Sequence, residues 1–188
     1  MKDIINTSPR LKTTIAEAAG VIAWIKSHSV PRYIFLLAQL DDKQGYPTGP
    51  LRLISGVLTR WTSLYHSLVR LLRVRTALEA LAYGRNYEIC CTAGMATGRT
   101  REQKERNRQK GVTILDLLHG REFWLRLEEA KEVLKPLALA ANLTQRDSFR
   151  MNHICNLLGC LFKFFSAGIL SNRSPQWRVR IQHLSNSE

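Results

Sequence analysis

An arginine followed directly by a tryptophan, Arg60–Trp61, is the pair whose residue types point most clearly to a chemistry. Aromatic rings of this kind stack on unpaired bases, while a neighbouring guanidinium holds the phosphate backbone. Thr62 and Ser63 follow, and either can cap a helix start, where free N–H groups and the helix dipole favour a phosphate. The structural alternative is that Trp61 packs at a corner between a strand and a helix, with the cap beside it.

The segment around this pair is strongly basic. Residues 43–78 hold six Lys and Arg residues and no Asp or Glu, and the whole chain has 28 Lys and Arg against 15 Asp and Glu, a formal net charge of +13. This excess favours polyanionic partners such as nucleic acid or an anionic membrane surface, although a solvated basic surface is the alternative. The candidate nucleic-acid contacts are Arg60, Trp61, Thr62, Ser63, Arg70 and Arg73.

The acidic residues and histidines of the sequence do not predict a catalytic centre. Enzymes that use two metals gather about three carboxylates, whereas Asp41 with Asp42 suits a solvated turn and Asp116 suits an exposed position on an amphipathic helix. The sequence has neither a nucleophile elbow nor a phosphate-binding loop, and its five histidines lack the spacing of metal ligands. We therefore expect no enzyme activity, no metal, no cofactor and no small-molecule substrate.

The four cysteines, Cys90, Cys91, Cys155 and Cys160, match neither a zinc site nor a disulfide framework. A thiol enzyme that pairs Cys155 or Cys160 with His153 is the least supported alternative. The opening residues lack the apolar block and cleavage site of a signal peptide. No apolar run approaches the roughly 20 residues that span a bilayer. We expect a soluble intracellular protein without a membrane partner.

The elements that must position the candidate residues are expected to be mostly helices, with at most one or two short strands. Apolar periodicity predicts helices over 9–28, from Pro31 to Leu40, from Thr62 or Ser63 to Gly84, and in two later segments. Those later segments run from Phe123 to Leu137, with Pro136 expected to kink or end the helix, and from Met151 to Phe165. Alternation over 51–57 predicts a strand after the loop at 41–50. The basic run 99–110 fits either an exposed helix start or a disordered insertion.

Three segments in series resemble the hAT family of transposases. They are T-R-W-x-S at 59–63, followed by Tyr65 and a Leu-rich helix; the opening KDIINTSPRLKTTIAEAAGVIAWIKSHSVPRYIF; and the later FWLRLEEAKEVLKPLALAANLTQRD. The resemblance covers roughly residues 2–165. It implies a ribonuclease H-like domain interrupted by a helical insertion, in which Trp61 stabilises a flipped base at the transposon end and Arg60 lies close by.

The same resemblance implies a catalytically incomplete relative. The family's catalytic aspartates are expected before this segment and its catalytic glutamate after it, and the zinc finger of the BED type is absent. We assign late ribonuclease H-like core elements to 1–84, a basic loop or insertion to 85–110, the helical insertion to 111–170 and a frayed tail to 171–188. The expected function is non-specific DNA binding, with a nuclear location implied by the family and the basic charge.

Two alternatives to DNA binding stay open. One is an interaction or dimerisation module, in which a homo- or hetero-oligomer buries an apolar stripe on the last helix. The stripe comprises Leu157, Leu158, Leu161, Phe162 and Phe165. Its plain interpretation is core packing. The other alternative is a transposon remnant without a function.

Overall fold

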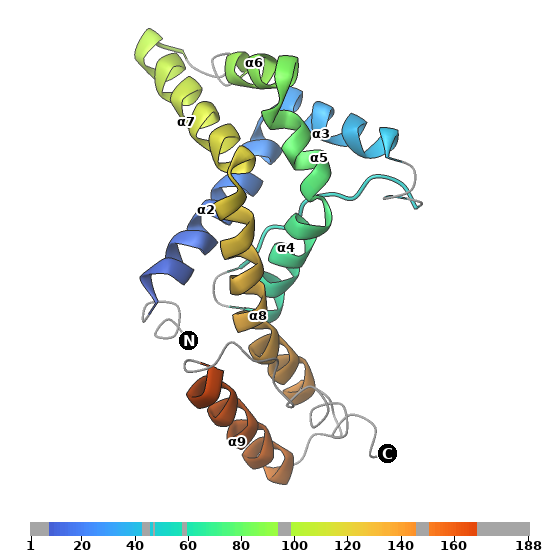
Figure 1. Ribbon diagram of the computed structural model, residues 1–188, viewed down its shortest axis with the longest axis vertical. Coiled ribbons are helices and arrows are strands. Elements are labelled where there is room, and N and C mark those ends of the chain that lie inside the picture. Colours follow the sequence, from blue (N-terminus) through green and yellow to red (C-terminus); the bar gives the residue numbers. More distant parts are fainter. Residues whose placement is uncertain are drawn as a thin grey trace. The chain divides into compact units, whose positions relative to one another are not determined.

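A computed structural model describes residues 8–42, 46, 48–57, 60–93, 99–145 and 151–168 of the 188-residue chain. The chain divides into two compact units, residues 1–132 and residues 133–188. The described residues form helices and no strand, so the expected mostly helical class is confirmed (Figure 1). None of the described helices is long and apolar enough to cross a membrane. The tail assigned to 171–188 lies outside the described residues.

Helix α2 (Pro9–Ser27) confirms the first predicted helix. Ser8 is its N-cap, whose hydroxyl accepts a hydrogen bond from the Leu11 N–H at 3.4 Å, and Pro9 is its first residue. The face that includes Ile15, Ile22 and Ile25 is buried. Helix α3 (Ser29–Asp41) follows after a break at His28 alone.

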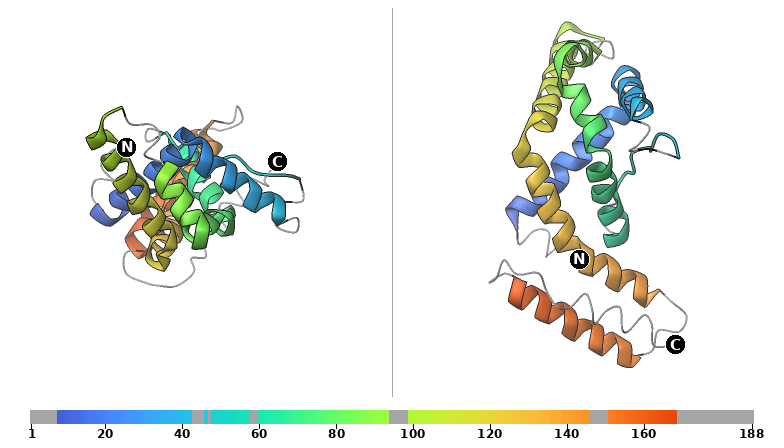
Figure 2. Two further views of the ribbon diagram at one scale, coloured as in Figure 1. Left: turned by 90° about the horizontal axis from the view of Figure 1, so that it is seen from above. Right: turned by 45° about the vertical axis from the view of Figure 1, so that its right-hand side comes forward.

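The predicted strand over 51–57 is wrong. These residues, here named the strap, have no regular structure, and no described strand lies beside them. Side chains of the neighbouring helices satisfy the strap's backbone instead. The buried Gln39 of α3 accepts from the Leu51 N–H at 2.7 Å and donates to the Leu51 carbonyl at 3.2 Å. Figure 2 shows the strap as the thin teal trace between α3 and the start of the next helix.

The long helix predicted from Thr62 or Ser63 to Gly84 is interrupted. Helix α4 (Trp61–Arg73) is separated by its C-cap residue, Val74, from α5 (Arg75–Glu79), and the short 3-10 helix η1 (Ala80–Ala82) follows. The leucines on either side of the break stay buried, so the predicted apolar face is retained. They are Leu64, Leu68, Leu71, Leu78 and Leu81.

Two helices cover most of the described part of residues 85–110, the region assigned to a basic loop or insertion. Helix α7 (Arg101–His119) begins within the basic run, so this run is the start of a helix. Helix α6 (Gly84–Ala93) packs on α7 (Figure 1). Thr100 and Gln103 close a capping box at the start of α7. Gly111 lies in the middle of α7, where an added Cβ would come within 3.3 Å of the Trp24 ring. The glycine thus permits α7 to approach α2 closely.

Helix α8 (Arg121–Thr144) does not end at Pro136, which lies inside it. In the first unit, the buried Trp124 of this helix donates from its ring N–H to the Leu118 carbonyl at 2.9 Å. The guanidinium of Arg75 lies over the same ring, 5.2 Å from its centre.

The second unit contains the end of α8 and helix α9 (Met151–Gly168). Leu157 packs with Ala140 and Leu143, and the half-buried Leu161 adds to this cluster. Leu158 and Phe162 remain 59 % and 73 % exposed. The apolar stripe therefore combines core residues with exposed ones, while the side chain of Phe165 lies outside the described set.

Candidate nucleic-acid interface

Arg60 and Trp61 lie at the start of α4. Arg60 is the N-cap residue, with extended backbone (φ −127°, ψ 104°) and an exposed side chain. Trp61 is the first helical residue and is half-buried, which leaves part of its indole in contact with solvent. Stacking on a base requires such partial exposure, and a packed corner would also produce it.

Thr62 and Ser63 do not cap α4, so that prediction is wrong. The helix begins one residue earlier than expected, and the side chain of its N-cap residue, Arg60, makes no capping hydrogen bond. The Ser63 hydroxyl instead accepts from the Val57 N–H at 3.2 Å and so fastens the strap. A helix start without a side-chain cap keeps backbone donors that favour an anion.

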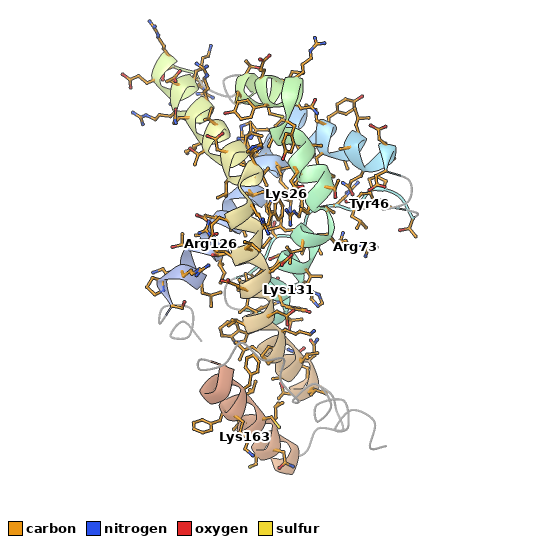
Figure 3. The ribbon with its side chains drawn as sticks, viewed as in Figure 1. Lys26, Tyr46, Arg73, Arg126, Lys131 and Lys163 are labelled. Carbon is orange, nitrogen blue, oxygen red and sulfur yellow. The ribbon has the colours of Figure 1, made fainter. Side chains whose placement is uncertain are left out.

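Arg70 and Arg73 lie at the other end of α4. The half-buried Arg70 donates from its guanidinium to the Arg52 carbonyl at 3.0 Å and therefore helps to hold the strap. Arg73 is exposed, and its backbone carbonyl accepts from the Tyr46 hydroxyl at 3.3 Å (Figure 3). At ~1.5 Å per residue, Arg60 and Arg73 are about 20 Å apart along the helix axis. The six candidates therefore form two groups rather than one cluster.

The cations of the strap and α4 lack acidic partners, in contrast to several arginines elsewhere. Within the part of the chain that the structure describes, Arg52, Arg60, Arg70 and Arg73 form no ion pair. Other arginines of the first unit approach carboxylates to 2.7–3.4 Å. These pairs are Arg10–Glu122, Arg10–Glu129, Arg75–Glu79 and Arg126–Glu17. The positive charge of the four arginines of the strap and α4 is thus not neutralised by an ion pair with any described carboxylate.

A pocket beside the strap was not predicted from the sequence. It has a volume of about 540 Å³ and is lined by Ile25, Lys26, Arg32, Phe35, Leu36, Arg52 and Leu53. We name this site the cationic pocket, because three of its lining residues are basic and none is acidic. Its residues come from α2, α3 and the strap, and no local spacing in the sequence connects them. Figure 3 labels Lys26, which lies on α2 next to Ile25.

The first half of α7 is a second basic surface. Residues 99–110 carry six Lys and Arg residues and two Glu residues, and nearly all of their side chains are exposed. Glu102 lies 3.7 Å from Arg106, and Glu105 lies 4.0 Å from Arg108. Exposed pairs of this kind contribute little to stability. The surplus positive charge on α7 therefore faces solvent.

The remaining candidate groups for chemistry are buried or structural. Burial, assisted by the neighbouring Cys91, raises the pKa of the Cys90 thiol to about 11, so this thiol is protonated at neutral pH. Burial and then the hydrogen bond to Asp116, 3.1 Å long, raise the pKa of Tyr87 to about 12. Asp116 is exposed, as expected. None of these groups is arranged as a nucleophile with a base.

Among the described side chains, no group of His, Cys, Asp and Glu residues is placed to hold a metal ion. No family model, no curated protein and no solved structure matches this chain. The candidate nucleic-acid interface is therefore defined by the chain's own residues: the Arg60–Trp61 corner, the basic end of α4 and the start of α7.

Proposed function

We propose that this chain binds nucleic acid without cutting it, and that it is a catalytically incomplete relative of the hAT transposases. The observation that carries the binding proposal is the acid-free stretch from residue 43 to residue 78, in which Arg75 pairs with Glu79 but the described arginines of the strap and α4 form no ion pair. Unpaired arginines that face solvent supply the counterion release on which affinity for a phosphate backbone depends.

The role proposed for the Arg60–Trp61 corner is contact with an unpaired nucleotide. The half-buried indole of Trp61 would stack on a base, while the exposed Arg60 and the uncapped start of α4 would face its phosphate. Arg73 would contact the backbone further along the strand. This assignment keeps the roles that the resemblance implies for Arg60 and Trp61.

The proposed family relation is supported by three segments of sequence in series. Two of them correspond to helix starts: T-R-W-x-S leads into α4, and F-W-x-x-L lies in the first turns of α8. The proposed division keeps late ribonuclease H-like core elements in 1–84 and the helical insertion in 111–170. A nuclear location is proposed on the same grounds, with the basic run 99–110 as a weak import signal.

A charge-matched pair of variants tests the binding proposal. Arg60→Gln/Arg73→Gln removes two arginines without a carboxylate partner, whereas Arg10→Gln/Lys131→Gln removes two cations that lie in ion pairs outside the candidate interface. Both variants lose the same net charge. We expect the first to weaken binding to a fluorescent single strand by about tenfold and to flatten the salt dependence by ~1.4 in slope, at about 0.7 per phosphate contact. Equal effects of the two variants would show that binding depends on net charge alone, and would contradict the proposed contacts of Arg60 and Arg73 with nucleic acid.

Association through α9 is the second candidate function, and the exposure of Leu158 and Phe162 favours it. Residues four apart on a helix share a face, so these two side chains form a small apolar surface. Phe162→Ser should abolish any self-association that sedimentation detects in the wild-type protein. A wild-type chain that stays monomeric at high concentration would exclude the homo-oligomer.

A further inference from the structure

We propose that the cationic pocket is a binding site for a small organic anion that carries an apolar body. This proposal goes beyond nucleic-acid binding, because the pocket contains none of the residues assigned to the Arg60–Trp61 corner. Its volume of about 540 Å³ falls within the range of small-molecule sites, about 300–1,000 Å³.

The pocket has an apolar floor and a charged rim. The apolar residues Ile25, Phe35 and Leu53 are 1 %, 2 % and 8 % exposed, so the pocket's floor is formed by side chains that are packed in the core. Lys26, Arg32 and Arg52 are exposed and carry the charge. An apolar group can therefore enter while an anionic group stays at the rim.

The rim is held in place by contacts that do not neutralise it. The Lys26 ammonium donates to the Ser55 hydroxyl at 2.8 Å, which orients the lysine but leaves its charge unpaired. Arg52 belongs to the strap, whose backbone is fixed by Gln39 and Arg70 on either side. The pocket thus needs little rearrangement to accept a ligand, and the cost of ordering side chains on binding is reduced.

The lining selects the class of ligand. A neutral apolar molecule would leave three cations at the rim without a partner, and an inorganic anion would leave the floor uncovered. Among the described residues, no carboxylate pairs with Lys26, Arg32 or Arg52, so a ligand must supply the negative charge. A carboxylate, sulfonate or phosphate attached to an aromatic or aliphatic body satisfies both parts of the pocket.

Three probes separate these contributions. We would titrate the full-length protein with 1-naphthalenesulfonate, with the neutral 1-naphthalenemethanol, and with inorganic sulfate, by calorimetry. The proposal predicts that the naphthalenesulfonate binds at least about tenfold more tightly than either of the others, since one charge-assisted contact contributes about that factor. Equal affinity for the two naphthalene compounds would overturn the proposal.

Variants that remove positive charge from the pocket locate the binding. Arg32→Gln/Arg52→Gln should weaken naphthalenesulfonate at least about tenfold, whereas Arg106→Gln/Arg108→Gln, with the same loss of charge on α7, should change it less than about twofold. Lys26→Gln, which leaves the strap's arginine intact, should also weaken binding. Equal effects of the pocket and control pairs, or no effect of Lys26→Gln, would place the ligand elsewhere. DNA binding measured on the same variants distinguishes failure here from failure of the nucleic-acid proposal.

Discussion

Replacing Gln39 with methionine tests how the strap is held. Methionine keeps the length and shape of the side chain but removes both hydrogen bonds to Leu51, which are 2.7 and 3.2 Å long. The Leu51 N–H and carbonyl would then lose their partners in a half-buried position. Each unsatisfied backbone group costs about 1–3 kcal/mol, and the lower half of that range applies at a half-buried site. We expect Gln39→Met to lower the free energy of unfolding by about 2–4 kcal/mol.

Urea unfolding, followed by tryptophan fluorescence and by far-ultraviolet circular dichroism, measures this loss. The midpoint should fall while the slope with urea stays constant, because the amount of surface exposed on unfolding is unchanged. Gln109→Met on the exposed face of α7 is the matched control, and its effect should remain within about 0.5 kcal/mol. A loss at Gln39 no larger than that of the control would refute the conclusion that this side chain replaces a neighbouring strand.

Two further predictions concern packing and pH. Gly111→Val should destabilise the protein by about 1–3 kcal/mol, because the valine side chain would meet the Trp24 ring. Gly20→Ala in α2 should stabilise the protein by about 0.5–1 kcal/mol, because a Cβ there meets no atom within 4 Å. Thermal unfolding of the two variants measures both effects. The free energy of unfolding should fall as pH rises from 9 toward 11, since burial raises the pKa of Cys90 from 9.0 to about 11 and the unfolded chain loses this proton first. Cys90→Ala should reduce that slope, and an identical slope in the variant would show that Cys90 is not responsible.

The helices with regular apolar spacing could be predicted from the sequence, since their buried faces repeat every three or four residues. Helix α2 begins at the predicted Ser8–Pro9 start because both residues act locally, one as a cap and one through its fixed φ. The break at Val74 was not predictable in this way. The apolar period continues through the break, so the pattern of leucines contains no signal for it.

The strap and the pocket depend on contacts between residues far apart in the sequence. Alternation over 51–57 predicts a strand, but a strand needs a second strand to pair with, and the side chain of Gln39 takes that place. The three rim cations come from positions 26, 32 and 52, whose proximity depends on how α2 and α3 pack. The Arg60–Trp61 corner, by contrast, consists of adjacent residues, so its composition could be predicted although the role of Ser63 could not.

The most direct test of nucleic-acid binding at the Arg60–Trp61 corner is fluorescence anisotropy across a salt series, with single- and double-stranded DNA and with wild type and Trp61→Ala in parallel. We predict that wild-type binding weakens with salt, and that Trp61→Ala lowers affinity for the single strand by about 1–3 kcal/mol. Affinity for the duplex should change little, because paired bases are not available for stacking. Equal affinities of folded wild type and folded Trp61→Ala for the single strand would contradict the proposed stacking of Trp61 on an unpaired base.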